Sequence, residues 1–253
     1  MQESRTDYYK QILIKGNYFP YYEKRFKDWI GADGNYHALR TKLAISCDQS
    51  KKQIAIDIGA NVGLMSRILA KSYDLVLAIE PSSQNRACLY RNMDIACNNV
   101  IVIPYAAGEK NEISKLRINP VNCGGSAIDE EYCKSDITET VRCYKIDDII
   151  DNFARSREVS LIKIDIQGRE IAALKGAAIT IKKHKPIIMC ETTNECDEKN
   201  QKHVDPIQIL EIFGYIKFIK MENDSIYIHK DKINNEVLEA AKEVTKLKTR
   251  STN

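Results

Sequence analysis

The sequence lacks a strong charge of either sign. Its 253 residues include 38 Lys and Arg against 35 Asp and Glu, a net charge of +3. A nucleic-acid-binding surface needs a stronger and more clustered basic charge, so we expect no nucleic-acid partner. Long apolar runs are also absent, and none approaches the roughly 20 residues that span a bilayer. The first ten residues, "MQESRTDYYK", lack the charged-then-apolar layout of a secretory signal. We therefore expect a cytoplasmic protein that does not contact a membrane.

The eight cysteines form no Cys-x-x-Cys pair, and no group of Cys and His has zinc-finger spacing. Reduced thiols in a reducing compartment are the expectation that follows. The 43% hydrophobic and 29% charged residues are typical of a globular protein with one large domain or two small ones.

From residue 53 onward, short apolar runs alternate with helical patterns, which predicts a doubly wound α/β domain with a mostly parallel sheet. The expected strands are 53–58, 74–80, 99–105, 159–166 and 185–191, and the expected helices are 62–72, 83–97, 170–183 and 206–214. The runs "GYIKFIK" and "IYIHK" follow as an antiparallel hairpin. We expect this domain to span 53–230, with two inserted strands and a loop within 108–146.

Two segments lie outside this alternation. Residues 1–52 hold nine of the nineteen aromatic residues, and Tyr22, Phe26, Trp29 and Ile30 fall on one helical face. This favours an N-terminal helical segment packed on the domain, with a cover over a substrate pocket as the alternative. Residues 231–253 are expected to form a C-terminal helix and a frayed basic tail.

A glycine turn joins the first strand to its helix in "AIDIGANVGLM". Gly59 permits a sharp turn and Gly63 a close approach to a ligand, while Asn61 tolerates left-handed geometry. The spacing differs from the Gly-x-Gly-x-x-Gly of pyrophosphate binders. Glu80 ends the second strand, where an acid accepts hydrogen bonds from a ribose diol, and Pro81 starts the next helix. Asp57 would attract a cationic amine and repel a pyrophosphate, which favours S-adenosylmethionine over NAD.

A second acid, Asp165, ends the strand in "LIKIDIQGRE". If this strand neighbours the first, Asp165 lies beside the glycine turn and faces the methyl acceptor. An alcohol must lose a proton to accept a methyl group, and Asp165 is the first candidate for the base. Glu191, at the end of the fifth strand, is the second, and His203 in the following loop is a third. Asp165 and Glu191 alone make a weak ligand set for Mg²⁺, so we predict no metal.

The motifs "AIDIGANVG", "AIEPS", "PYAAGE", "KIDIQGREIAALKGA" and "IFGY" resemble the FkbM-type methyltransferases in order and spacing. The resemblance implies the class I methyltransferase fold, a Rossmann-like seven-stranded sheet with an antiparallel last strand. It also implies S-adenosylmethionine-dependent O-methylation of a hydroxyl on a sugar, glycan or small natural product. By motif position, the methionine part would contact Asp57, Gly59, Asn61 and Gly63, the ribose Glu80, and the adenine Ala106 and Ala107.

One residue departs from the pattern of many relatives. Position 167 is Gln rather than Glu, so it offers no carboxylate base. Two other classes of function stay open on the sequence alone. One is a methyltransferase that acts on RNA or protein, and the other is an NAD enzyme or a nucleotide-binding protein without catalysis.

Overall fold

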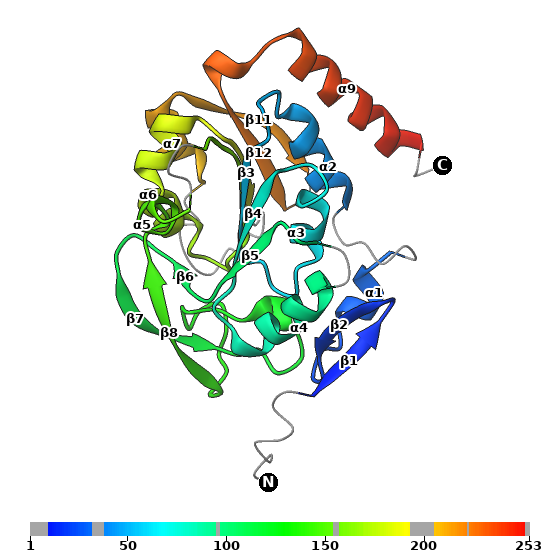
Figure 1. The fold of residues 1–253 in the computed structure, drawn as a ribbon, viewed down its shortest axis with the longest axis vertical. Coiled ribbons are helices and arrows are strands. Elements are labelled where there is room, and N and C mark those ends of the chain that lie inside the picture. Colours follow the sequence, from blue (N-terminus) through cyan, green and yellow to red (C-terminus); the bar gives the residue numbers. More distant parts are fainter. Residues whose placement is uncertain are drawn as a thin grey trace.

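The centre of the protein is a seven-stranded sheet (Figure 1). The computed structural model describes residues 10–31, 38–94, 97–153, 157–192, 205–221 and 223–250. The sheet has the order β11-β12-β10-β9-β3-β4-β5. Its strands are β3 (Ile54–Ile58), β4 (Leu75–Ile79), β5 (Val100–Ile103), β9 (Val159–Ile164), β10 (Ile187–Glu191), β11 (Tyr215–Met221) and β12 (Asp224–His229).

The strand directions confirm the predicted fold class. Strands β5, β4, β3, β9 and β10 pair in parallel, whereas β12 is antiparallel to both β10 and β11. The predicted terminal hairpin is thus formed by β11 and β12, and β12 is the antiparallel last strand. The strand order reverses between β3 and β9, which in doubly wound sheets is where ligands bind.

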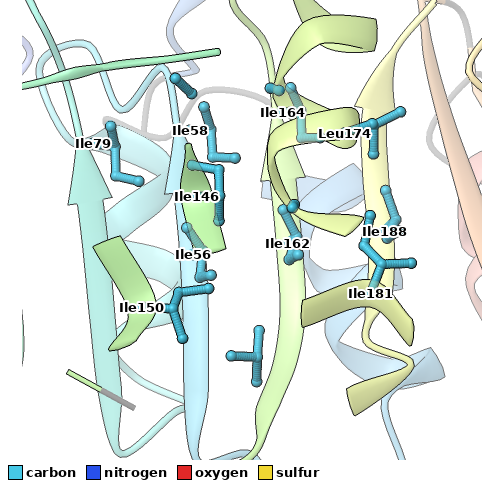
Figure 2. Packing of buried hydrophobic residues seen from close by; sticks show 14 of the residues in the cluster. Ile56, Ile58, Ile79, Ile146, Ile150, Ile162, Ile164, Leu174, Ile181 and Ile188 are labelled. Atoms are coloured by element: carbon cyan, nitrogen blue, oxygen red, sulfur yellow. The ribbon is translucent and has the colours of Figure 1, made fainter. Parts of the chain in front are cut away.

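Isoleucine dominates the packing against one face of the sheet. Figure 2 shows Ile56, Ile58, Ile162 and Ile188 of the central strands in contact range of side chains from three helices. The central strands are buried along their whole length because helices cover both faces, as the continuous apolar runs predicted.

The two helical layers come from different parts of the chain (Figure 1). One face is covered by α5 (Ile146–Asp151), α6 (Glu170–Gly176), α7 (Ala178–His184) and α8 (Ile207–Leu210), with the 3-10 turn η2 (Glu211–Phe213). The other is covered by α2 (Ala38–Cys47) and α3 (Leu64–Leu69), and α4 (Ser83–Asp94) follows β4. A C-terminal helix was expected, and α9 (Asn235–Arg250) forms it after the turn η3 (Lys230–Lys232). Its packing against α2 was not expected. Among the helices described, none combines the length and apolarity that crossing a bilayer requires.

The helix predicted over 170–183 is divided in two at Ala177. Its first part ends at Gly176, where an added Cβ would lie 2.0 Å from the carbonyl oxygen of Gly108. The close approach of the Gly108 backbone explains why the helix has glycine at position 176.

The N-terminal segment differs from the single helix that the aromatic pattern suggested. Residues 10–31 form a β-hairpin, β1 (Gln11–Ile14) and β2 (Asn17–Pro20), followed by the one-turn helix α1 (Phe26–Trp29). The expected helical face is also wrong, because Phe26 and Ile30 are buried whereas Trp29 is 46% exposed. Lys15 and Gly16, both with positive φ, form the two-residue turn of this hairpin. Its two strands have only four residues each, which is too short for the sequence pattern to reveal them.

The inserted segment forms a small separate sheet. Strands β6 (Ala106–Ala107), β8 (Thr138–Tyr144) and β7 (Glu112–Arg117) pair in that order, and the 3-10 turn η1 (Cys123–Gly125) lies between β7 and β8. The two inserted strands are confirmed, and β6 is an additional one.

Candidate active site

One cavity of about 530 Å³ lies at the carboxyl ends of the central strands. Eight residues expected from the sequence line it, namely Gly59, Asn61, Glu80, Pro81, Ala106, Ala107, Asp165 and Glu191. Asp57 and Gly63 are not among its described lining residues. His203 lies outside the described residues.

The glycine turn after β3 is shaped by its neighbour strand. Gly59 has φ +77°, and an added Cβ would lie 1.9 Å from the carbonyl oxygen of Asp165. Asn61 follows with φ +53°, the left-handed geometry expected for it. The amides of Gly59 and Ala60 both donate to the carbonyl oxygen of Ile79. The turn is therefore pressed between the ends of β4 and β9, with no room for a side chain.

Gly63 has a different role from the expected ligand contact. It is the N-cap of α3 with φ +87°, and an added Cβ would lie 2.9 Å from Met93 Cε and 3.1 Å from Leu89 Cγ. Both neighbours belong to α4. Gly63 thus lets α3 begin tightly against α4, and the cavity lies elsewhere.

Glu80 is buried at the tip of β4, and its carboxylate is held from two sides. Oε2 accepts a hydrogen bond of 2.8 Å from the amide of Asn61, and Oε1 accepts one of 2.8 Å from the amide of Ser82. Burial raises the pKa of Glu80 to about 7, although these two amides lower it. Each oxygen keeps acceptor capacity toward the cavity that it lines.

Asp57 does not face the cavity, which corrects the expected contact with a ligand amine. Its carboxylate accepts a hydrogen bond of 2.6 Å from Ser66 Oγ and lies 3.1 Å from Lys163 Nζ. Lys163 Nζ also donates to the carbonyl oxygen of Gly59 at 3.0 Å and lies 3.9 Å from Asp165. Burial alone would lower the pKa of Lys163, but the carboxylates of Asp57 and Asp165 outweigh it and raise that pKa. Asp57 therefore pairs with Lys163 and does not line the cavity.

Asp165 and Glu191 are brought together by the residue that departs from the family pattern. Gln167 Nε2 donates to Asp165 Oδ1 at 3.2 Å and to Glu191 Oε2 at 2.9 Å. Burial and the nearby carboxylate of Asp165 raise the pKa of Glu191. Gln167 has φ +53°, and Gly168 has φ +100° with the ring of Tyr132 where a Cβ would be. This strained turn directs the amide of Gln167 at both acids.

Two buried oxygens at the cavity lack a donor in the described part of the chain. They are Oδ1 of Asn61 and Oδ1 of Asn85, and both residues line the cavity. The amide nitrogen of Asn85 donates to the carbonyl oxygen of Cys123 at 3.1 Å, which fixes the orientation of its side chain. A buried acceptor without a donor costs free energy, so these oxygens indicate a ligand with N–H or O–H groups.

The model of the methyltransferase FkbM domain matches residues 57–217, well over half of the chain. The chain belongs to the FkbM methyltransferase family. No curated protein sequence gives a match.

Several solved structures resemble the chain at low identity. An FkbM methyltransferase from Methylobacillus flagellatus KT has 20% identity and a TM-score of 0.49, and the alignment covers 70% of this chain and 44% of that one. An rRNA methylase from Streptococcus thermophilus has 7% identity and a TM-score of 0.44, covering 75% and 92%. M. jannaschii TYW2 in complex with AdoMet has 12% identity and a TM-score of 0.37, covering 90% and 89%. The chain aligns with less than half the length of the M. flagellatus protein.

The FkbM match begins at Asp57, yet part of the cavity wall lies outside it. Phe26 and Trp29 of α1, Arg40 of α2, and Asn223 and Asp224 at the start of β12 also line the cavity. Sequence reasoning missed Arg40 and Asp224 as site residues. They form a largely buried ion pair, and Asp224 is the register partner of Glu191 across β10 and β12. Burial raises the pKa of Asp224, and the Arg40 guanidinium partly offsets this.

A sequence signal for these residues existed only in part. The hairpin was predicted, but position 224 fell in its expected turn, "MENDS", and was not placed beside the end of β10. Nothing in the local sequence pairs Arg40 with a residue 184 positions later. The described residues contain no cluster of three or more His, Cys, Asp or Glu side chains that could hold a metal ion. The absence of a metal stays a prediction.

Proposed function

We propose that the protein is an S-adenosylmethionine-dependent O-methyltransferase that acts on a hydroxyl of a sugar, a glycan or a small natural product. The observation that carries the proposal is the buried Glu80 carboxylate, held by two amides beside the Asn61 and Asn85 oxygens that have no donor. Together they offer acceptors to a ribose diol and to amino or hydroxyl groups of a nucleoside. FkbM family membership supports the same chemistry.

The residues present fit this cofactor. Glu80 would bind the ribose hydroxyls, and the small side chains of Ala106 and Ala107 leave room for a flat adenine at the side of the cavity they line. Gly59 and Asn61 would contact the methionine part. S-adenosylmethionine supplies a methyl group already activated by a positive sulfur. A pyrophosphate would lie beside the buried acid Glu80 without a Gly-x-Gly-x-x-Gly turn to bind it, which disfavours NAD.

The acceptor hydroxyl must be oriented and must lose its proton. Gln167 holds Asp165 and Glu191 side by side, so a hydroxyl between them can donate to one acid and accept from the other. Because burial and Asp165 raise the pKa of Glu191, Glu191 is the acid that holds a proton. Asp165, whose side chain remains 29% exposed, is then the base for the hydroxyl proton. Lys163 fixes the Asp165 end of this pair from below.

The cofactor assignment is tested by titration calorimetry with S-adenosylhomocysteine and, separately, NAD. We expect binding of S-adenosylhomocysteine alone, and a loss of about tenfold or more in affinity in Glu80→Ala, because a charge-assisted hydrogen bond contributes about 1.5–3 kcal/mol. Glu130→Ala is the matched control, since Glu130 is an exposed acid that pairs with Arg117. Binding of NAD with no binding of S-adenosylhomocysteine would sink the proposal.

The reaction is tested by mass spectrometry of hydroxyl compounds incubated with the protein and S-adenosylmethionine, in which each transfer adds about 14 daltons. Asp165→Asn should lower kcat by about 10²–10⁴ while the affinity for S-adenosylhomocysteine stays unchanged. Adding a chelator should leave the rate unchanged. A near-wild-type rate in Asp165→Asn would remove Asp165 from the chemistry.

A further inference from the structure

Trp29 is a large apolar side chain that lines the cavity and is partly exposed. It is the sole tryptophan of the sequence, its side chain is 46% exposed, and it lines the cavity. The adjacent Phe26 ring is only 3% exposed, with the two ring centroids 5.6 Å apart in an edge-on arrangement. Single exposed apolar residues are ordinary on protein surfaces. One that borders a polar cavity offers a flat apolar face to whatever binds there.

The indole sits on a rigid support. Oε1 of Glu23 accepts hydrogen bonds from the amides of Arg25 and Phe26, which fixes the start of α1, and Oε2 accepts one from the amide of Cys123. The Phe26 ring is also part of a buried cluster with Phe19. Because α1 is held at both its backbone and its aromatic core, the Trp29 ring needs little reordering to receive a ligand.

The same cavity carries acceptors and donors of the kind that bind hydroxyl groups. Asp165, Gln167 and Glu191 line it and form the hydrogen-bonded cluster described above. The ligand that matches both features has one apolar face of C–H groups and an edge of hydroxyls. A pyranose ring has this form.

We propose that Trp29 is a specificity-determining residue, the platform on which a pyranose ring stacks with its hydroxyls toward Asp165, Gln167 and Glu191. The proposal rests on the proposed function, because it names the acceptor class of that reaction. It goes beyond family membership, since residue 29 lies outside the matched residues 57–217.

The test uses the full chain saturated with S-adenosylhomocysteine, with methyl α-glucopyranoside as the probe. Because the sequence has a single tryptophan, tryptophan fluorescence reports on position 29 alone. We expect a saturable change of emission with the glycoside and none with sorbitol, which has hydroxyls but no ring. In saturation-transfer NMR, the signal on the C–H protons of the glycoside should survive in Trp29→Phe. Trp29→Ala should weaken binding about tenfold, in line with the contribution of an aromatic contact.

Tyr90→Ala is the matched control, because Tyr90 is 50% exposed on α4 and does not line the cavity. It should bind the glycoside as the wild type does. Calorimetry with S-adenosylhomocysteine separates the two levels of the argument and shows that each variant is folded. If S-adenosylhomocysteine binds and the glycoside leaves the emission unchanged, the platform is wrong while the proposed function stands. A response to choline without one to the glycoside would reveal an aromatic site for cations and overturn the proposal.

Discussion

The buried Glu80 makes the stability of the fold depend on a single proton. Its pKa is about 7 in the folded protein and 4.5 in an unperturbed chain. Between these values the folded protein binds more protons than the unfolded chain, so its stability must fall as the pH rises. The stabilising contribution is fully present below about pH 4.5 and is lost as the pH passes 7.

We therefore expect the stability difference between wild type and Glu80→Gln to depend on pH. Raising the pH from 5 to 8 should remove about 2 kcal/mol from the free energy of unfolding of the wild type relative to Glu80→Gln, because the neutral amide does not titrate. Urea denaturation of both proteins at the two pH values measures this, and other groups cancel in the difference. A difference that is constant with pH would show that Glu80 is not shifted upward.

Gly59 and Gly16 separate backbone strain from steric exclusion. Both have positive φ, +77° and +79°, so alanine pays the left-handed penalty of about 1–2 kcal/mol at either position. An added Cβ at Gly16 meets no atom within 4 Å, whereas at Gly59 it overlaps the Asp165 carbonyl oxygen. We expect Gly59→Ala to lower the free energy of unfolding by more than about 4 kcal/mol, and Gly16→Ala by no more than the strain alone. Denaturant midpoints give both values, and equal losses would contradict the close approach of β3 and β9.

At the scale of elements, β3 and β9 are joined by the buried Lys163–Asp57 pair as well as by their ladder. The two side chains are 5% and 0% exposed. Removing one partner leaves a buried charge without compensation, so Lys163→Met should cost about 3–5 kcal/mol of stability. The double variant Lys163→Met with Asp57→Asn has no net buried charge and keeps a partner for Ser66, so it should recover most of that loss.

Chemical denaturation of the single and double variants measures this coupling. Lys175→Met is the control, because the Lys175–Glu109 pair is exposed and should be worth less than about 1 kcal/mol. Losses that simply add in the double variant would mean that Lys163 and Asp57 do not depend on each other.

The elements differed in how well the sequence predicted them. The buried strands β3, β4, β9 and β10 were predicted because their continuous apolar runs permit little else between two helical layers. The β1–β2 hairpin was not, because four-residue strands give too few alternations. Its one signal was the Lys15-Gly16 turn, a pair less distinctive than Asn-Gly. The glycine at position 176 is required by its contact with Gly108, far away in the chain, which no local pattern records.

At the scale of the whole molecule, the cavity is assembled from distant parts of the chain, namely the N-terminal segment, the ends of the central strands, the inserted segment and the start of β12. The sequence located Glu80, Asp165 and Glu191 because parallel strands deliver their carboxyl ends to one edge of the sheet. The prediction for Asp57 was wrong because the buried Lys163 binds its carboxylate, and the sequence pattern does not reveal that contact. For Trp29 the sequence left two alternatives, a packed helix face or a cover over the pocket. The position of Trp29 depends on how α1 packs, which the local sequence does not determine.

Glu23 joins two of these segments, the N-terminal one and the inserted one. Its carboxylate is buried and accepts hydrogen bonds from the amides of Phe26 and of Cys123, 100 residues later. The amide of Lys24 adds a hydrogen bond to the carbonyl oxygen of Val121. Phe26 and Cys123 both line the cavity, so Glu23 fixes one side of its wall.

Glu23→Gln should loosen this wall, because one amide side chain cannot accept on both of its terminal atoms. The Cys123 or the Phe26 amide then loses its acceptor, at a cost of about 1–3 kcal/mol. In hydrogen-exchange mass spectrometry, peptides that span 119–126 or 23–30 should exchange faster, while those from β9 stay protected. Glu130→Gln, a change at an exposed acid of the same insert, should alter neither. Binding of S-adenosylhomocysteine should restore part of the protection, because the ligand fills the cavity that this wall encloses. Uniform acceleration across the protein, β9 included, would instead mean that Glu23 supports global stability and not the cavity wall.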